Sequence, residues 1–259
     1  MEPNDDRTLR RVALVTGGAQ GIGAEICRRL AASGVTVRVA DIDLPAAEAH
    51  AAALRAQGGR ASALHLDVGS AASVGEAFAR VAAEDGRCDI LVNCAGIAKV
   101  FPFLEFPLEN FVATMNVNVT GTLLCSQHAA RMMVREGWGR IVNIASVAGL
   151  RAVGTGRTAY GTSKGAVIAL TRQMAVELAE HGVTANAVCP GPVDTPMTRV
   201  LHTDRFREAY AKAIPVERYG TTGEIASAVM YLVSEEASYV TGIEMPVDGG
   251  FLASGARGL

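Results

Sequence analysis

Residues 12–24 read VALVTGGAQGIGA, an apolar run of strand length followed by a glycine-rich turn and the start of a helical segment. Glycines at positions 17, 21 and 23 remove side chains that would block a close approach to the backbone. The helical segment, Ala24 to Ala32, points its N-terminus at this turn. Unpaired amides and the positive end of the helix dipole form an anion site there. The stretch therefore predicts a site for the pyrophosphate of a dinucleotide. Its expected binding residues are Gly17, Gln20, Gly21 and Gly23.

Composition restricts the class of partner. The 259 residues are 49% hydrophobic, but no stretch approaches the roughly 18 to 20 continuous apolar residues of a membrane span. The formal net charge is −2 with both signs interspersed, so we expect neither nucleic acid nor a membrane surface as a partner. A small-molecule substrate is favoured.

The cysteines show no spacing typical of metal ligands, so we expect no metal site. The first ten residues are polar and lack the apolar segment of a secretion signal. We therefore expect a cytoplasmic protein with free thiols. The cysteines are at positions 27, 88, 94, 125 and 189.

Apolar runs of strand length alternate with segments of helical period along the whole chain. The expected strands are Val12 to Val15, Val35 to Ala40, Ala61 to Leu66, Ile90 to Asn93, Ile141 to Ala145, Thr184 to Val188 and, more weakly, Ile243 to Val247. The expected helices are Ala24 to Ala32, Ala46 to Gln57, Ala72 to Ala83, Leu108 to Arg135, Ala159 to Glu180 and Thr222 to Ser234. Strands that are apolar throughout indicate a sheet covered on both faces.

This alternation predicts a single doubly wound, Rossmann-type α/β domain over residues 1–259. We expect a seven-stranded, mostly parallel sheet with helices on both faces. The one irregular insertion, Pro190 to Pro215, carries a helical stretch near Arg199 to Ala213 and follows a strand end. Loops of that length are usually functional, so a lid is expected there.

Asp41 ends the second strand, about twenty residues after the glycines, where a carboxylate can accept hydrogen bonds from a ribose. It would also repel a 2′-phosphate, so NAD is expected and NADP is less favoured. Asp41 could instead cap the next helix, but Asp43, two residues before Pro45, is the better cap. Strand alternation places Arg38 on the opposite face, away from a 2′-phosphate.

Further polar and small residues follow the third and fourth strands. Asp67 and Val68 follow the third, where an adenine edge and its ribose would lie. Asp67 as a simple helix cap is an open alternative. Asn93, Ala95 and Gly96 follow the fourth strand in the same way, and Cys94 between them is better explained as a small buried residue than as a reactive thiol.

Tyr160 and Lys164 lie four residues apart in a helical stretch, so their side chains share one face. At an effective dielectric of 20, a cation about 4 Å from a phenolate stabilises it by roughly 4 kcal/mol. A free phenol titrates at about pH 10, so such a neighbour brings proton exchange toward neutral pH. Ser146 follows the fifth strand, where its hydroxyl can orient a substrate oxygen, or it is only a turn residue.

These motifs, taken in order, resemble those of the short-chain dehydrogenase/reductase family. They are Thr16-Gly17-x-x-x-Gly21-x-Gly23, Asn93-Cys94-Ala95-Gly96, Ser146 and Tyr160-x-x-x-Lys164. The resemblance runs from Arg11 to Gly250 and includes Pro190-Gly191 and the closing Asp248-Gly249-Gly250. Two departures are small: Cys94 stands where the family often has a second Asn, and the interval from Ser146 to Tyr160 contains a slightly long loop.

The resemblance implies roles for individual residues. Tyr160 is the general acid/base, Lys164 holds the nicotinamide ribose, and Ser146 steadies the substrate oxygen. The family's catalytic Asn, which organises a proton-relay water, matches Asn118 in Asn118-Val119-Thr120-Gly121 better than its neighbour Asn116. Positions that line the cofactor match Ile22, Asn93, Pro190, Val193 and Thr195.

Substrate contacts are expected from segments that follow the catalytic strands: Lys99 to Phe103, Val147 to Thr155, and Met197 to Tyr210. His202 and Arg205 could recognise a polar or anionic group, but solvent-exposed charges on the lid are the favoured interpretation. The apolar candidates, which ordinary packing would explain as well, are Val147, Val153, Met197, Val200 and Leu201.

Three functions compete. The first is an NAD(H)-dependent oxidoreductase that interconverts a secondary alcohol and a ketone. The second is a 3-oxoacyl-(acyl carrier protein) reductase using NADPH, with Arg131, Arg135 and Arg172 docking an acidic carrier. The third is a non-catalytic nucleotide sensor on the same fold, which the intact Ser146 and Tyr160 argue against. The family resemblance further implies a homotetramer formed through the two long helical segments.

Overall fold

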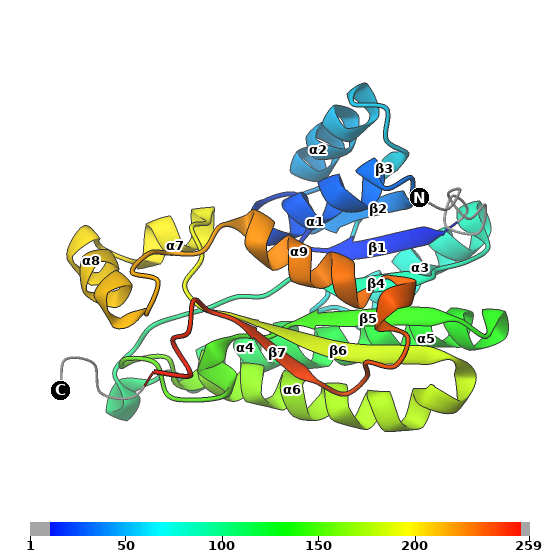
Figure 1. Ribbon diagram of the computed structural model, residues 1–259. Helices are drawn as coiled ribbons and strands as arrows, with labels where there is room; N and C mark the ends of the chain where they lie inside the picture. The colour runs from blue at the N-terminus through cyan, green and yellow to red at the C-terminus, as the bar shows by residue number, and fades with distance from the viewer. Residues whose placement is uncertain (1–10, 255–259) are drawn as a thin grey trace.

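Within residues 11–254, which the computed structural model describes, seven strands form one sheet in the order β3-β2-β1-β4-β5-β6-β7 (Figure 1). The strands are β1 (Val12–Thr16), β2 (Thr36–Asp41), β3 (Ala61–His65), β4 (Ile90–Asn93), β5 (Gly139–Ile144), β6 (Val183–Pro190) and β7 (Glu244–Val247). Every pairing between neighbours is parallel, so the predicted doubly wound sheet is confirmed. The first ten residues, used above to argue against a secretion signal, lie outside the described residues.

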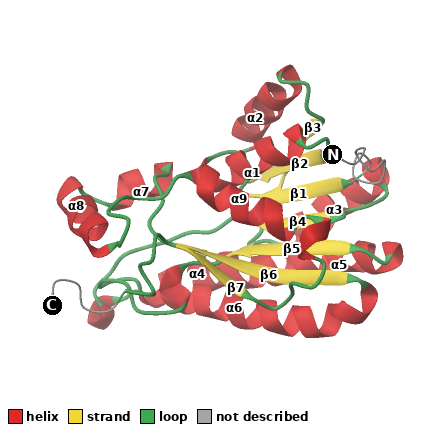
Figure 2. Cartoon of the chain, in the orientation of Figure 1, coloured by secondary structure: helices red, strands yellow, loops and turns green. Residues whose placement is uncertain are grey.

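Helices cover both faces of the sheet (Figure 2). They are α1 (Gly21–Ala32), α2 (Leu44–Ala56), α3 (Ala71–Asp85), α4 (Leu108–Met115), α5 (Gly121–Glu136), α6 (Thr158–Leu178), α7 (Pro196–Leu201), α8 (Asp204–Ala213) and α9 (Thr222–Leu232). Short helical turns are η2 (Phe103–Glu105), η3 (Asn116–Thr120), η4 (Val147–Gly149), η5 (Ala179–His181) and η6 (Glu235–Ala237). Helices α1, α2 and α9 share one apolar cluster with the sheet, and α3, α5 and α6 share another.

Strand β1 shows why the central strands are apolar at every position. All five of its residues are buried. Ala13 and Val15 point into the cluster beneath α1, α2 and α9, whereas Leu14 points into the opposite cluster. Since β2 and β4 flank β1 on its two sides, the winding direction reverses at β1, and a crevice opens at the carboxyl ends of the strands.

The helical stretch expected over Leu108 to Arg135 is interrupted. Helix α4 ends at Met115, a π-helical turn spans Asn116–Thr120, and α5 begins at Gly121. A π-turn adds one residue to the repeat, which rotates the following side chains relative to a regular helix. Here the turn coincides with Asn118, which is 1% exposed.

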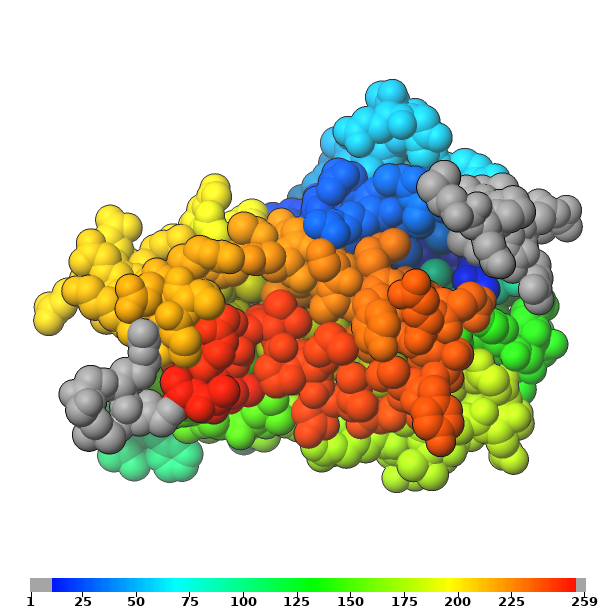
Figure 3. Space-filling view, viewed as in Figure 1, coloured from blue at the N-terminus to red at the C-terminus, as the bar shows by residue number. Residues whose placement is uncertain are grey.

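The insertion after β6 differs from its expected form. The expectation of a single helical stretch near Arg199 to Ala213 is wrong, because α7 ends at Leu201 and α8 begins at Asp204. Thr203 stops a continuous helix, because its side chain accepts a hydrogen bond from Phe206 N and caps α8. Figure 3 shows the yellow surface of this segment projecting at one end of the molecule.

Candidate active site

The glycine-rich loop approaches its neighbours too closely for side chains. Gly17 has φ of +63°, and a Cβ there would lie 2.9 Å from Ala95 Cα. Gly21 has φ of +60°, and a Cβ on Gly23 would lie 2.1 Å from the Gly17 carbonyl oxygen. Helix α1 begins at Gly21, three residues before its expected start, so its N-terminus lies within the loop itself. The loop leaves a cradle at a helix N-terminus that fits a pyrophosphate.

A cavity of about 390 Å³ lies at the carboxyl ends of the strands. It brings together most of the residues expected from the sequence: Gly17, Gln20, Gly21, Ile22, Asp41, Asp67, Val68, Ala95, Gly96, Ser146, Tyr160, Lys164, Pro190, Val193 and Thr195. Gly23, Asn93 and Asn118 are not part of its lining. The sequence did not single out apolar lining residues such as Ile42, Leu66 and Val117, because their character resembles that of ordinary core residues.

Asp41 lies at the end of β2 with its carboxylate at the cavity. The carboxylate accepts hydrogen bonds from Ala19 N in the glycine-rich loop and from Asp43 N, both at 3.1 Å. Asp43, not Asp41, caps α2 by accepting from Ala46 N. Asp41 is therefore free of a capping role and lines the cavity, and its contact with a ribose stays a prediction.

Arg38 is committed to other groups. Its guanidinium makes a bidentate pair with Asp85 at 2.6 and 2.7 Å and also binds Glu84 and Ser62. The side chain is 7% exposed. Arg38 consequently belongs to ion pairs with Asp85 and Glu84, and it does not line the cavity.

Asp67 is not the cap of α3. Ser70 is the N-cap residue, and its side chain accepts from Ser73 N. The Asp67 carboxylate instead accepts a hydrogen bond from Gly69 N at 2.9 Å, and Asp67 lines the cavity beside Val68.

Ser146, Tyr160 and Lys164 meet at one end of the cavity. Lys164, 6% exposed, donates to the Ile144 carbonyl at 2.7 Å, and its Nζ lies 5.7 Å from the centre of the Tyr160 ring. Ser146 follows β5, and its hydroxyl accepts from Ala148 N at 3.1 Å. An ammonium has three donors, so the single bond to Ile144 leaves Lys164 two for a ligand.

Asn118 holds Ile97, one of the residues that line the cavity, through hydrogen bonds. Its Oδ1 accepts from Ile97 N at 2.9 Å, and its Nδ2 donates to the Ile97 carbonyl and to Ser163 Oγ. Ser163 in turn donates to the Tyr160 carbonyl. Asn116, the alternative considered above, donates to the Gly69 carbonyl instead. The side chain of Asn118 thus links the loop that follows β4 to α6.

Asn93 has a different environment from that expected. Its amide donates to Ser126 Oγ at 3.0 Å and to Asn143 Oδ1 at 2.8 Å in the interior. Asn143 continues this chain by donating to Thr171. The Asn93 side chain thus ties β4 to β5 and α5, while the residues that follow it reach the cavity.

The thiol beside the cavity is desolvated. Burial raises the pKa of the Cys94 thiol to about 11, although the Lys164 cation opposes the shift. The cysteines are free, and the location in the cytoplasm stays a prediction. Over residues 11–254, no cluster of three or more potential ligands could hold a metal, and no helix has the length and apolarity needed to cross a membrane.

A second cavity of about 70 Å³ shares Ser146 and Tyr160 with the first. Expected residues that line it are Val147, Val153, Met197, Leu201 and His202. Val200 is 87% exposed and takes no part, and residues 99–103 line neither cavity. The favoured interpretation of His202 as solvent-exposed is wrong, since it is 7% exposed. Tyr210, the last residue of the expected segment Met197 to Tyr210, also lines it, whereas Arg157 lies outside every expected segment and was missed.

Known proteins resemble this chain over nearly its whole length. A family model described as Enoyl-(Acyl carrier protein) reductase matches residues 17–252. The short-chain reductase protein NovJ of Streptomyces niveus is 42% identical, covering 92% of this chain and 93% of the relative. The 3-oxoacyl-(acyl carrier protein) reductase FabG of Aquifex aeolicus is 39% identical, covering 93% of this chain and 96% of the relative. A solved gluconate 5-dehydrogenase from Burkholderia cenocepacia, in complex with NADP and tartrate, has a TM-score of 0.90 and 33% identity, covering 95% of this chain and 96% of that one.

Proposed function

The chain belongs to the short-chain dehydrogenase/reductase family, and we propose that it interconverts a secondary alcohol and a ketone with NAD(H). It is an oxidoreductase acting on a CH–OH or carbonyl group with NAD(P). One observation carries the proposal: Ser146, Tyr160 and Lys164 line the same cavity as Gly17 and Asp41.

The protein's own groups supply proton transfer and orientation. Tyr160 accepts the proton of a substrate hydroxyl in oxidation and donates it to a carbonyl oxygen in reduction. Ser146 already accepts from Ala148 N, so its hydroxyl hydrogen can be donated to the substrate oxygen. Lys164 has two donors for the ribose, and its charge stabilises negative charge on the phenolic oxygen. When bound, NAD(H) supplies the hydride donor or acceptor.

Asn118 acts as a positioning residue in this proposal. Its amide holds Ile97 and, through Ser163, the backbone of Tyr160. With these bonds made, the side chain has no amide hydrogen left for a substrate. The relay water that the family resemblance implies would therefore depend on the shape of the π-turn at Asn118.

NAD is favoured over NADP by the charges near the ribose position. Asp41 places a carboxylate at the cavity, and Arg38 is paired with Asp85 on the other face of β2. A 2′-phosphate would meet a like charge without a nearby cation from this strand.

Tyr160→Phe tests the proposed acid/base directly. A panel of secondary alcohols and ketones is assayed with NAD(H) and NADP(H). We expect the wild type to turn over members of the panel with NAD(H), and Tyr160→Phe to lose activity while still binding NADH. The matched control is Tyr239→Phe, because Tyr239 is fully exposed. A near wild-type rate in Tyr160→Phe would remove the proposed acid.

The second candidate, a 3-oxoacyl-(acyl carrier protein) reductase using NADPH, draws support from the FabG relative. Arg131 and Arg135 lie exposed on α5, where an acidic carrier could reach them, but Arg172 pairs with Glu244 at 2.9 Å. Preference for NADPH and for carrier-bound over free 3-oxoacyl groups would favour this candidate over the first.

We further propose a homotetramer. The support is the family resemblance and exposed apolar side chains on the two long helices, Leu123 on α5 and Val176 on α6. The C-terminal residues that the resemblance assigns to tetramer contacts include 255–259, which lie outside the described residues. A monomer in sedimentation at micromolar concentration would contradict the proposal.

A further inference from the structure

The second cavity, where a substrate must reach Tyr160, has a charged wall. Its lining combines Ser146 and Tyr160 with Arg157 from the loop before α6, His202 from the segment between α7 and α8, and Tyr210 from α8. Arg157 precedes Tyr160 by three residues at the start of α6, so the two side chains lie near one another along the helix. A guanidinium therefore shares a small cavity with the proposed acid/base.

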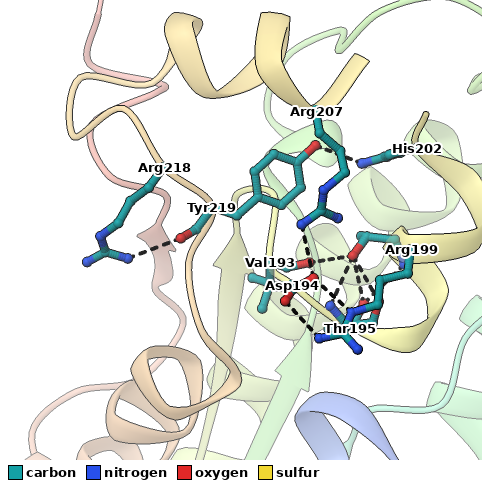
Figure 4. A network of polar contacts seen from close by, with 9 residues as sticks. Val193, Asp194, Thr195, Arg199, His202, Arg207, Arg218 and Tyr219 are labelled. Carbon is teal, nitrogen blue, oxygen red and sulfur yellow. Dashed lines mark hydrogen bonds and ion pairs between the residues drawn. The ribbon is translucent and has the colours of Figure 1, made fainter. Parts of the chain in front are cut away.

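Arg157 differs from the other arginines around the lid. Figure 4 shows Asp194 between Arg199 and Arg207, with which it forms ion pairs at 2.9 and 3.0 Å. Arg218 pairs with Glu224. In the described part of the chain, no acidic side chain lies within 4.0 Å of the Arg157 guanidinium, which is half-buried. Its positive charge is thus uncompensated at a cavity wall.

His202 holds this guanidinium without neutralising it. Arg157 Nη2 lies 2.7 Å from His202 Nε2, and because arginine is only a donor, Nε2 must accept. The ring proton is then on Nδ1, which donates to the Tyr219 hydroxyl at 2.9 Å (Figure 4). Burial, together with the Arg157 and Arg207 cations, lowers the pKa of His202 to about 4. A neutral imidazole fixes the direction of the guanidinium and leaves its charge intact.

Two tyrosines, Tyr219 and Tyr210, lie beside His202. Tyr219, which accepts from His202, lies with its ring 4.4 Å from the Arg207 guanidinium. Burial raises the pKa of Tyr210 to about 12, so its phenol is neutral as well. The groups named here that face Arg157 from α8 and from the segment at 219 are therefore neutral or positive, so its guanidinium is available to pair with a negatively charged ligand.

We propose that the substrate is a short-chain oxo acid or hydroxy acid whose carboxylate binds Arg157 while its carbonyl or alcohol oxygen meets Ser146 and Tyr160. This inference rests on the proposed oxidoreductase function. A carboxylate matches the planar donor fork of arginine in a bidentate pair, which gives the substrate one orientation. The cavity of about 70 Å³ favours a short acid.

Matched acids and amides test the charge alone. The probes are 3-oxobutanoate and 3-oxobutanamide, extended to acid and amide pairs of up to six carbons, assayed with NADH and NADPH. We expect the wild type to show kcat/KM higher for the acid than for the amide by at least about tenfold, as a charge-assisted bidentate pair gives. Arg157→Leu should lose that preference while keeping amide turnover and NADH binding.

Two further variants separate charge recognition from damage to the fold. Arg157→Lys should keep part of the preference, since it retains the charge but not the fork. Arg205→Leu removes an exposed lid charge and should leave the ratio unchanged. A wild-type preference for amides would overturn the inference, and so would equal losses of kcat/KM for acid and amide in Arg157→Leu. In either case, turnover that depends on Tyr160 would still support the proposed oxidoreductase function. Absence of turnover with every carbonyl compound would instead contradict both.

Discussion

Gly23→Ala adds one methyl group at the tightest contact of the glycine-rich loop. A Cβ at this position lies 2.1 Å from the Gly17 carbonyl oxygen, 2.9 Å from Gly17 C and 3.2 Å from Gly18 Cα. Carbon contacts become favourable only at about 3.5 Å, so the turn must move by more than about 1 Å. These obstacles are backbone atoms and cannot rotate away as a flexible side chain would.

The size of the effect follows from two opposing terms. Alanine favours a helix over glycine by about 1 kcal/mol, whereas overpacking costs about 1–3 kcal/mol and sometimes more. Because backbone must shift, we take the upper end and expect Gly23→Ala to lower the free energy of unfolding by about 2 kcal/mol. Gly75 in α3 is the matched control, since nothing lies within 4 Å of a Cβ there. Gly75→Ala should therefore keep only the gain of about 1 kcal/mol.

Thermal unfolding and NADH titration measure both consequences. At this chain length 1 kcal/mol changes Tm by about 2–4 °C, so Gly23→Ala should melt about 4–8 °C lower and Gly75→Ala about 2–4 °C higher. NADH fluorescence should show at least about tenfold weaker binding for Gly23→Ala, because the displaced Gly17 lines the cavity. If Gly23→Ala matched Gly75→Ala in Tm and in NADH affinity, the close approach of this backbone would not be what the loop requires.

Asp41→Ser should raise the ratio of kcat/KM with NADP to that with NAD, because it removes the like charge at the ribose end; an unchanged ratio would contradict the role of Asp41. Arg38→Leu should leave that ratio alone but lower stability in urea by about 3–5 kcal/mol, since Asp85 loses its buried partner, and a shifted ratio would place Arg38 at the cofactor after all. His202 has its pKa lowered from 6.5 to about 4, so its contribution to stability is present above pH 6.5 and is lost as pH falls toward 4. His202→Gln, which cannot take up that proton, should flatten the decline of Tm across this range, and an unaltered decline would assign it to other groups.

The sheet could be predicted because the fold places apolar residues at every position of its strands. Val12 to Val15 is buried on both faces, and that pattern is visible without coordinates. The interruption at Asn118 could not be predicted, since the apolar period of the flanking helices continues through it. At the π-turn, the side chain of Asn118 makes a pair of hydrogen bonds to Ile97, which is 21 residues away in sequence. Local pattern carries no information about such a partner.

The residues of the candidate site also differ in how far the sequence predicts their positions. Asp41 and Tyr160 could be predicted to line the cavity, because the proposed chemistry needs those residue types at a strand end and on a helix face. His202 was misjudged because a histidine on a polar, charged helical segment resembles a solvent-exposed group. Its burial depends on Tyr219 and Arg157, which approach it from other parts of the chain. Arg157 gave no signal beyond lying one helical turn before Tyr160.

Under the proposals above, the groups that transfer the proton and the group that recognises the substrate are anchored in different ways. Lys164 is held by the carbonyl of Ile144 at the end of β5, and Asn118 is held by main-chain atoms of Ile97 in the loop that follows β4. Such contacts survive most changes of side chain at the partner positions, because the partners are main-chain atoms. Arg157, by contrast, is held by the side chain of His202 on the lid. Under these proposals, substitutions in the lid would redirect the guanidinium, and with it the choice of substrate, without moving the atoms proposed to transfer the proton.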